Sequence, residues 1–224
     1  QWLLDRSELE AVFHEQAGVL HIRMTCQTDD KDRAQAWKTF LEKVDPVVKP
    51  WFNKLDKKLV VAAAKFDIDK NRYGVHLRNV KTDVELFCDE NVPLETQVEL
   101  LAQEYYTKVG AMTVTFRGQE YTMQQMIPFA GDPDRQLREE AWRITTQRWA
   151  QEIHTYEEIF DKLRTLRGNI AKNAGFKNFR DYCFKAKHRF DYTPDDCRAY
   201  HDGVEEVVVP VLKRMADQRR KDMK

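Results

Sequence analysis

Residues 132–182 read DPDRQLREEAWRITTQRWAQEIHTYEEIFDKLRTLRGNIAKNAGFKNFRDY, and this stretch decides the fold class. Its apolar residues recur mostly every three or four positions, which is the spacing of one face of an α-helix. They are Leu137, Ala141, Ile144, Trp149, Ile153, Tyr156, Phe160, Leu163, Leu166, Ile170 and Ala174. Acidic residues crowd the start and basic residues the end, an order that complements the helix dipole. The pattern predicts one long helix of about 60 Å, at ~1.5 Å per residue.

The residues after this helix carry clear start and stop signals. Gly175 can adopt the left-handed conformation that ends many helices, and Asn178 can cap a short helix after it. Thr193-Pro194-Asp195-Asp196 predicts the start of a last helix, because threonine caps and proline is tolerated at the first helical position. Pro210 should kink that helix, since proline removes a backbone hydrogen bond.

Residues 1–111 also have helical periodicity, and the chain has one β signal. Met112, Val114 and Phe116 alternate with polar residues, and Arg117-Gly118 can form a two-residue turn. We therefore predict a mainly α fold, an elongated multi-helix array with one small β-hairpin near residues 112–121. We expect an N-terminal helical region at 1–131 and a long-helix region at 132–224, which together form one continuous structural unit.

Composition excludes several classes of protein. Charged residues make up 33% of the 224 residues, the mean hydropathy is −0.70, and no apolar run approaches the ~20 residues of a membrane span. The formal net charge is zero, whereas nucleic acid binding usually needs a basic surface. The four cysteines are sparse and unevenly spaced, which favours free thiols in a reducing cytoplasm. We predict a cytoplasmic protein that binds neither membrane nor nucleic acid.

No metal site can be assembled from the sequence. His14-Glu15 begins like the zinc-peptidase motif H-E-x-x-H, but position 18 is Gly18, so the second histidine is missing. Cys183, His188, Cys197 and His201 form a loose set whose spacing matches no common zinc finger. Packed thiols and surface histidines explain these residues better. We therefore predict no metal ligand and no catalytic residue in this chain.

Two groups of polar residues leave alternatives open. Arg135 and Arg138 lie one turn from acidic residues, where arginine commonly stabilises a helix start. Arg167, Asn169 and Asn173 could instead face a cleft and bind a peptide backbone. Nothing local distinguishes the two readings, so the substrate-binding residues stay unidentified.

The order of several motifs resembles one peptidase family. These are Glu90-Asn91-Val92-Pro93-Leu94, Val114-Thr115-Phe116-Arg117-Gly118-Gln119-Glu120-Tyr121-Thr122, Asp132-Pro133-Asp134-Arg135, Arg138-Glu139-Glu140-Ala141-Trp142, Ile170-Ala171-Lys172-Asn173-Ala174-Gly175-Phe176, Asn178-Phe179-Arg180-Asp181-Tyr182 and Phe190-Asp191-Tyr192-Thr193-Pro194-Asp195-Asp196. In this order they are similar to the oligoendopeptidase F family, which is more distantly related to thimet oligopeptidase.

The resemblance implies a mostly helical zinc oligopeptidase whose channel admits short peptides. In that family, two histidines of H-E-x-x-H and a downstream glutamate hold zinc, and the motif glutamate is the general base. These positions lie in the C-terminal half of such enzymes, so the resemblance assigns no catalytic residue here. It implies part of the channel wall, with short peptides and the C-terminal catalytic half as partners and zinc as the cofactor of the parent enzyme.

A second reading is a non-catalytic helical module, derived from such an enzyme, that binds a protein or a peptide. The two readings differ in what they expect at the surface. If a catalytic half normally packs on this chain, the apolar stripe of the long helix or the faces around residues 207–212 should be incompletely covered. A sealed surface would favour the module.

Overall fold

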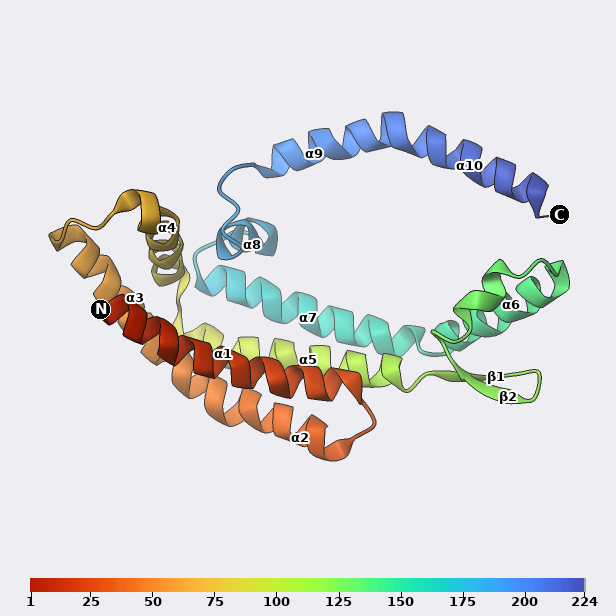
Figure 1. Cartoon of the computed structure of the whole chain (residues 1–224), viewed down its shortest axis with the longest axis horizontal. Coiled ribbons are helices and arrows are strands. Elements are labelled where there is room, and N and C mark those ends of the chain that lie inside the picture. Colours follow the sequence, from red (N-terminus) through yellow and green to blue (C-terminus); the bar gives the residue numbers. More distant parts are fainter. Residues whose placement is uncertain (224) are drawn as a thin grey trace. The chain divides into compact units, whose positions relative to one another are not determined.

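The computed structural model describes residues 1–223, which divide into two compact units. Unit 1 comprises Gln1–Ala111 and His154–Ala186; unit 2 comprises Met112–Ile153 and the residues from Lys187 to the end of the described chain. Helices dominate, and one two-stranded antiparallel sheet accompanies them (Figure 1). This confirms the mainly α fold with one hairpin. The division into 1–131 and 132–224 stays a prediction.

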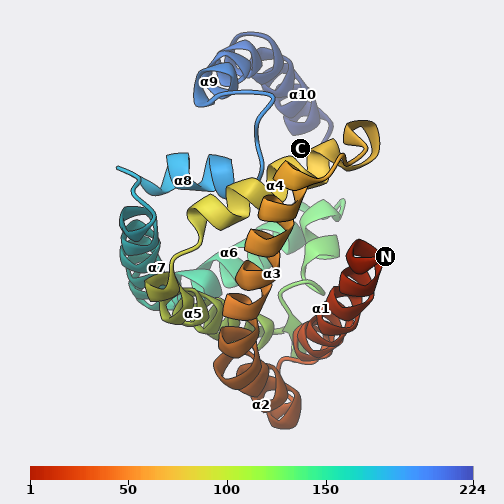
Figure 2. The same cartoon turned by 90° about the vertical axis from the view of Figure 1, so that its left-hand side faces the viewer.

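Unit 1 is built from helices, and part of its core is a cluster of four buried residues. The helices are α1 (Trp2–Cys26), α2 (Lys31–Thr39), α3 (Asp45–Lys65), α4 (Lys70–Leu86), α5 (Val92–Gly110), α7 (Ile153–Asn173) and α8 (Phe179–Ala186). Met24, Trp37, Phe40 and Leu41 form the cluster, and Leu100 of α5 packs against it. The chain runs along α1 and returns through α2 and α3 in the opposite direction (Figures 1 and 2).

Unit 2 contains the β-hairpin. Strands β1 (Thr113–Phe116) and β2 (Gln119–Thr122) pair in antiparallel register, with Val114 opposite Tyr121. The turn residues Arg117 and Gly118 have φ of 50° and 83°, and a type I′ turn requires positive φ at both positions. Met112, Val114 and Phe116 are buried. The predicted strands, turn and buried face are confirmed.

The prediction of one unbroken helix from Asp132 is wrong. The segment forms α6 (Arg135–Gln151) and α7, and Glu152 between them has φ −98° and ψ 1°. The Glu152 N–H donates to the carbonyl of Trp149, three residues back, instead of continuing the four-residue ladder. The physical reason is packing: Ala141 is buried within unit 2, whereas Ile159 is buried within unit 1.

The start and stop signals after residue 170 are confirmed. Gly175 has φ 82°, the Phe176 N–H bonds to the carbonyl of Ala171, and together these form a Schellman stop. The Asn178 side chain accepts from the Asp181 N–H at 2.9 Å. Thr193 and Asp196 form a reciprocal capping box.

The last helix bends through a wide turn. It consists of α9 (Pro194–Gly203), a π-helical turn (Val204–Val208) and α10 (Val209–Asp222). Val209 donates to the carbonyl of Val204, five residues back, just before Pro210. The same arrangement precedes Pro46, where Asp45 donates to Phe40 after a π-helical turn at Phe40–Val44. A widened turn accommodates the proline ring, which would otherwise crowd the preceding carbonyl.

The sequence predicts that the chain contains no membrane-spanning helix. Within residues 1–223, no helix combines the length and the apolar character that crossing a bilayer requires. This agrees with the sequence, in which no continuous apolar run approaches the ~20 residues of a membrane span.

Candidate functional site

The residues considered as metal ligands do not form a metal site. Across the described residues, no group of three or more His, Cys, Asp or Glu side chains is placed to hold a metal ion. His14 on α1 packs beside the rings of Phe13 and Phe52, with ring centroids 5.4 Å and 6.1 Å away. The described residues therefore do not fit the zinc that the family resemblance implies.

The cysteine and histidine set is distributed over both units. Cys183 lies in unit 1 on α8, whereas His188, Cys197 and His201 belong to unit 2. All four cysteines of the chain are free thiols; Cys26 is exposed, and the other three are half-buried. None of them is paired in a disulfide, as the sparse spacing indicated.

Arg135 and Arg138 stabilise the start of α6. Arg135 pairs with Glu139 at 2.9 Å. Arg138 Nη1 donates to the carbonyls of Asp132 and Pro133 at 2.6 Å and 2.9 Å, and its Nη2 donates to the carbonyl of Met223 at 2.5 Å. Their donors are thus engaged by the chain itself, which favours the structural interpretation of this pair.

Arg167 and Asn173 also contact their own unit. The Arg167 guanidinium lies 5.8 Å from the Phe179 ring centroid. Asn173 Nδ2 donates to Asn91 Oδ1 at 2.9 Å, and Asn91 Nδ2 donates to the Ile170 carbonyl at 3.0 Å. Asn169 is exposed. Sequence reasoning missed Asn91, a buried side chain that joins the start of α5 to the end of α7, because the contact spans about eighty residues of chain.

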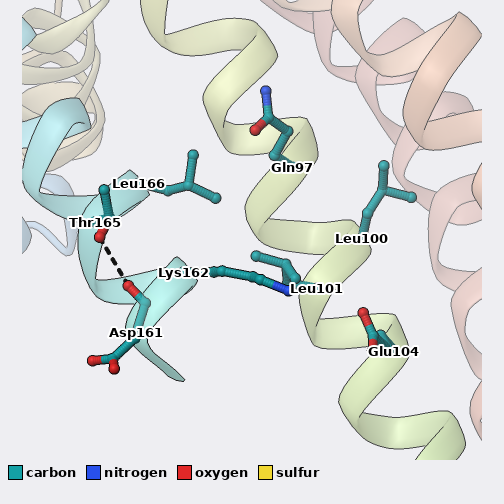
Figure 3. A pocket seen from close by; sticks show the side chains of 8 residues that line it. All are labelled: Gln97, Leu100, Leu101, Glu104, Asp161, Lys162, Thr165 and Leu166. Atoms are coloured by element: carbon teal, nitrogen blue, oxygen red, sulfur yellow. Dashed lines mark hydrogen bonds between the residues drawn. The ribbon is translucent and has the colours of Figure 1, made fainter. Parts of the chain in front are cut away.

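A groove between α5 and α7 is the main candidate for a binding surface. It has a volume of about 610 Å³ and lies within unit 1. Figure 3 shows its lining side chains, four from each helix. They are Gln97, Leu100, Leu101, Glu104, Asp161, Lys162, Thr165 and Leu166.

The chemistry of this groove suits binding. Leu100, Leu101 and Leu166 supply the apolar surface, and Leu101 and Leu166 lie between the two helices in Figure 3. The Thr165 hydroxyl is bonded to the Asp161 carbonyl at 2.9 Å, as expected of a helical threonine that is not activated as a nucleophile. An apolar floor with polar side chains around it can accommodate apolar side chains of a peptide while its backbone stays hydrated.

A second apolar pocket lies within unit 2. It has a volume of about 330 Å³, and its lining includes Met123, Met126, Ile127, Trp142 and Trp149. Trp142 is 60% exposed although its ring is apolar on both faces. Methionine and tryptophan together make an adaptable apolar surface.

Charged groups meet in unit 1 where several helices converge. Lys49 of α3 pairs with Asp45 at 2.8 Å and with Glu95 of α5 at 2.9 Å. Burial alone would lower the pKa of Lys49, but the hydrogen bond to Asp45 and the charge of Glu95 raise it overall. Burial raises the pKa of Tyr182 on α8 to about 12, with the charge of Glu95 adding to the shift. This cluster fixes helices relative to one another.

Two family models match the chain, in the order expected for one protein. The model of the peptidase M3 N-terminal domain matches residues 1–87, and the model of peptidase family M3 matches residues 129–224. Comparison with curated proteins gave no match.

Solved structures resemble the chain over nearly its whole length. The structure of a provisionally named oligoendopeptidase F is 26% identical with a TM-score of 0.87, and PZ peptidase A with an inhibitor is 25% identical with a TM-score of 0.85. A provisionally named oligoendopeptidase F from Bacillus anthracis str. Ames, 24% identical with a TM-score of 0.85, shows the same fold. Each match covers 96% of this chain but only 38%, 38% and 39% of the respective relative.

Proposed function

Because this chain belongs to peptidase family M3, we propose that it is the N-terminal helical portion of a zinc-dependent oligopeptidase. The parent enzyme would hydrolyse peptide bonds in short peptides. The observation that carries this proposal is the consecutive match of two models of one family, together with solved peptidases that share the fold. The printed names of those relatives describe peptidases, which supports peptide hydrolysis as the parent reaction.

In this proposal the chain forms part of the wall of the substrate channel, and the catalytic residues lie elsewhere in the protein. The described residues offer no metal-binding group, and His14-Glu15 lacks the second histidine at position 18. The zinc would therefore be held by residues in the part of the protein that corresponds to the remaining 62% of the relatives (100 − 38). That part, like the peptide substrate, is a proposed partner of this chain.

The α5–α7 groove is the surface we assign to peptide contact. A channel wall that contacts short peptides of varied sequence needs apolar surface but no strict recognition of side chains. The three leucines of the groove, with their polar neighbours, provide such a surface. We further propose a cytoplasmic location, which the four free thiols support, since structural disulfides are typical of secreted proteins.

The test compares the 224-residue chain with the complete polypeptide that its gene encodes. Zinc content and hydrolysis of a quenched-fluorescent short peptide are measured for both. We expect the complete polypeptide to hold zinc and to cleave the peptide, with loss of activity on addition of a chelator. The chain alone should do neither.

Two results would contradict the proposal. Zinc at one equivalent together with peptidase activity in the 224-residue chain would show that the chemistry lies within it. A reading frame without a downstream H-E-x-x-H would instead support the second reading, a non-catalytic helical module that binds a protein or a peptide.

The substitution Leu101→Lys tests the groove separately. Introduced into the complete polypeptide, it should raise the KM for an apolar peptide. The control Thr107→Lys, on the same helix but outside the groove residues, should leave the KM unchanged.

A further inference from the structure

The C-terminal helical arm is unusual because it buries nothing. From α9 through the π-helical turn to α10, none of the described residues is buried. Between Glu205 and Asp222, only Val209 is even partly shielded. Helices in proteins gain most of their stability by packing an apolar face, so a helix without a packed face lacks its main stabilising contact.

This arm carries an apolar face that the other described residues leave largely exposed. The face consists of Val207, Val208, Val211, Leu212 and Met215, called here the arm stripe. Their spacing of one, three, one and three residues places them on one side of a helix. Val207, Leu212 and Met215 are 64%, 56% and 63% exposed, although each carries a large apolar side chain. Contiguous apolar surface of this kind marks an interaction site.

We propose that the arm stripe is the docking surface for the catalytic remainder of the same protein. This inference rests on the proposed function, because it takes that remainder to exist. The relatives share the fold over 96% of this chain, and in them it makes up only 38% of the polypeptide. The additional 62% (100 − 38) is the one large body of protein that accompanies this fold in the relatives. It is also covalently linked, so its effective concentration at the stripe is high.

The composition of the stripe fits a permanent intramolecular contact better than a transient one. It contains no charged residue over the positions that share this face, and permanent interfaces resemble a core cut in half. The charged residues Lys213 and Arg214 lie between Leu212 and Met215 in the sequence but are not part of the stripe, and Asp217, Arg219, Arg220 and Lys221 follow it. A partner that packs apolar side chains along Val207–Met215 would complete a core that the arm cannot form by itself.

Amide hydrogen exchange tests the proposal directly. Exchange of residues 204–215 is measured in the 224-residue chain at two concentrations and in the complete polypeptide encoded by its gene. We expect exchange at least about tenfold slower in the complete polypeptide, since amides in a packed helix exchange only through an opening reaction. In the isolated chain, exchange should be fast at both concentrations.

Substitutions then show that the stripe itself makes the contact. Leu212→Gln with Met215→Gln, introduced into the complete polypeptide, should restore fast exchange in residues 204–215. The matched control is Lys213→Gln with Asp217→Asn, two exposed positions off the stripe. Both double variants leave the net charge unchanged, and the control should keep slow exchange.

Each other outcome overturns the proposal. Slow exchange in the isolated chain that depends on concentration means that a second copy covers the stripe. Slow exchange independent of concentration means that the chain covers it itself. Equal, fast exchange in both proteins, or a gene that ends with this chain, leaves the stripe without the proposed partner. Failure of the proposed function is distinguishable: protected residues 204–215 in a complete polypeptide without peptidase activity would contradict the activity and leave the docking intact.

Discussion

At the residue scale, Gly110 is required by a close approach rather than by its backbone conformation. Gly110 is the last residue of α5, and the following Ala111 is still right-handed, with φ −83°. A Cβ at position 110 would lie 3.2 Å from both Cβ and Cγ2 of Thr28 and would overlap the Thr28 hydroxyl. Only glycine lets these two segments of unit 1 approach so closely.

Gly110→Ala should therefore lower the free energy of unfolding by about 1–3 kcal/mol, the usual range for overpacking. The measurement is chemical denaturation monitored by circular dichroism. Gly18→Ala is the matched control, because it lies inside α1 with nothing within 4 Å of the added Cβ. It should stabilise the protein by about 0.5–1 kcal/mol through helix propensity. Removing the Thr28 hydroxyl and methyl group with Thr28→Ala should restore part of the stability that Gly110→Ala loses. An unchanged free energy of unfolding for Gly110→Ala, or no such recovery in the double variant, would contradict the clash.

Tyr182 is the residue whose ionisation should respond to folding. Its pKa is raised from 10.0 to about 12, first by burial and then by the nearby charge of Glu95. The unfolded chain loses the tyrosine proton near pH 10, while the folded chain keeps it. Stability from this group is thus fully present below pH 10 and is lost as the pH rises toward 12.

We expect Tyr182→Phe to remove part of this alkaline loss of stability. The free energy of unfolding of the wild-type chain should fall between pH 10 and 12 more steeply than that of the variant. Tyrosinate absorbance near 295 nm should also lose one late-titrating group. Tyr200→Phe serves as the control, since Tyr200 is 70% exposed. Identical absorbance titrations for wild type and Tyr182→Phe would show that burial does not raise this pKa.

At the element scale, Asn91 joins α5 to α7. Its side chain is 2% exposed, donates to the Ile170 carbonyl at 3.0 Å and accepts from Asn173 at 2.9 Å. These two bonds connect the start of α5 to the end of α7, and α5 and α7 are the helices that line the groove of Figure 3.

Asn91→Ala should lower the free energy of unfolding by about 2–3 kcal/mol, because it leaves buried polar groups without partners. Asn173→Ala removes only one of the two hydrogen bonds, so it should lower the free energy of unfolding by less. Asn71→Ala on α4 is the control, since Asn71 is exposed. Thermal or urea unfolding gives the comparison, and a loss for Asn91→Ala no greater than for Asn71→Ala would refute the coupling.

At the scale of the whole molecule, the two units have separate buried residues. Unit 1 buries the cluster of Met24, Trp37, Phe40 and Leu41 among other residues, whereas unit 2 buries Met112, Val114 and Phe116, at and within the first strand of its hairpin. Separate cores of unequal size are expected to unfold at different denaturant concentrations.

We therefore expect two transitions in guanidinium chloride when hydrogen exchange is followed separately in each unit. Phe116→Ala should shift the transition of unit 2 to lower denaturant, by about 3–5 kcal/mol in free energy, and leave that of unit 1 nearly unchanged. Phe40→Ala should do the reverse. A single transition, shifted equally by both substitutions, would show that the units unfold as one.

The sequence by itself determined the local structure of this protein. Helical periodicity, the Arg117-Gly118 turn, the Gly175 stop and the Thr193 capping box are interactions among neighbours in the chain, so their residues identify them directly. The family resemblance followed from the same residues, although their order along the chain carried it rather than any one site.

Only the tertiary structure decided the features that depend on distant residues. The break at Glu152, the clash beyond Gly110, the buried Asn91 and the groove between α5 and α7 each arise from segments far apart in sequence. The exposure of the arm stripe is of the same kind, because periodicity identifies an apolar face but not its partner. Local free energies fix each helix, whereas packing free energies, which depend on what lies across the core, fix where helices break and what they cover.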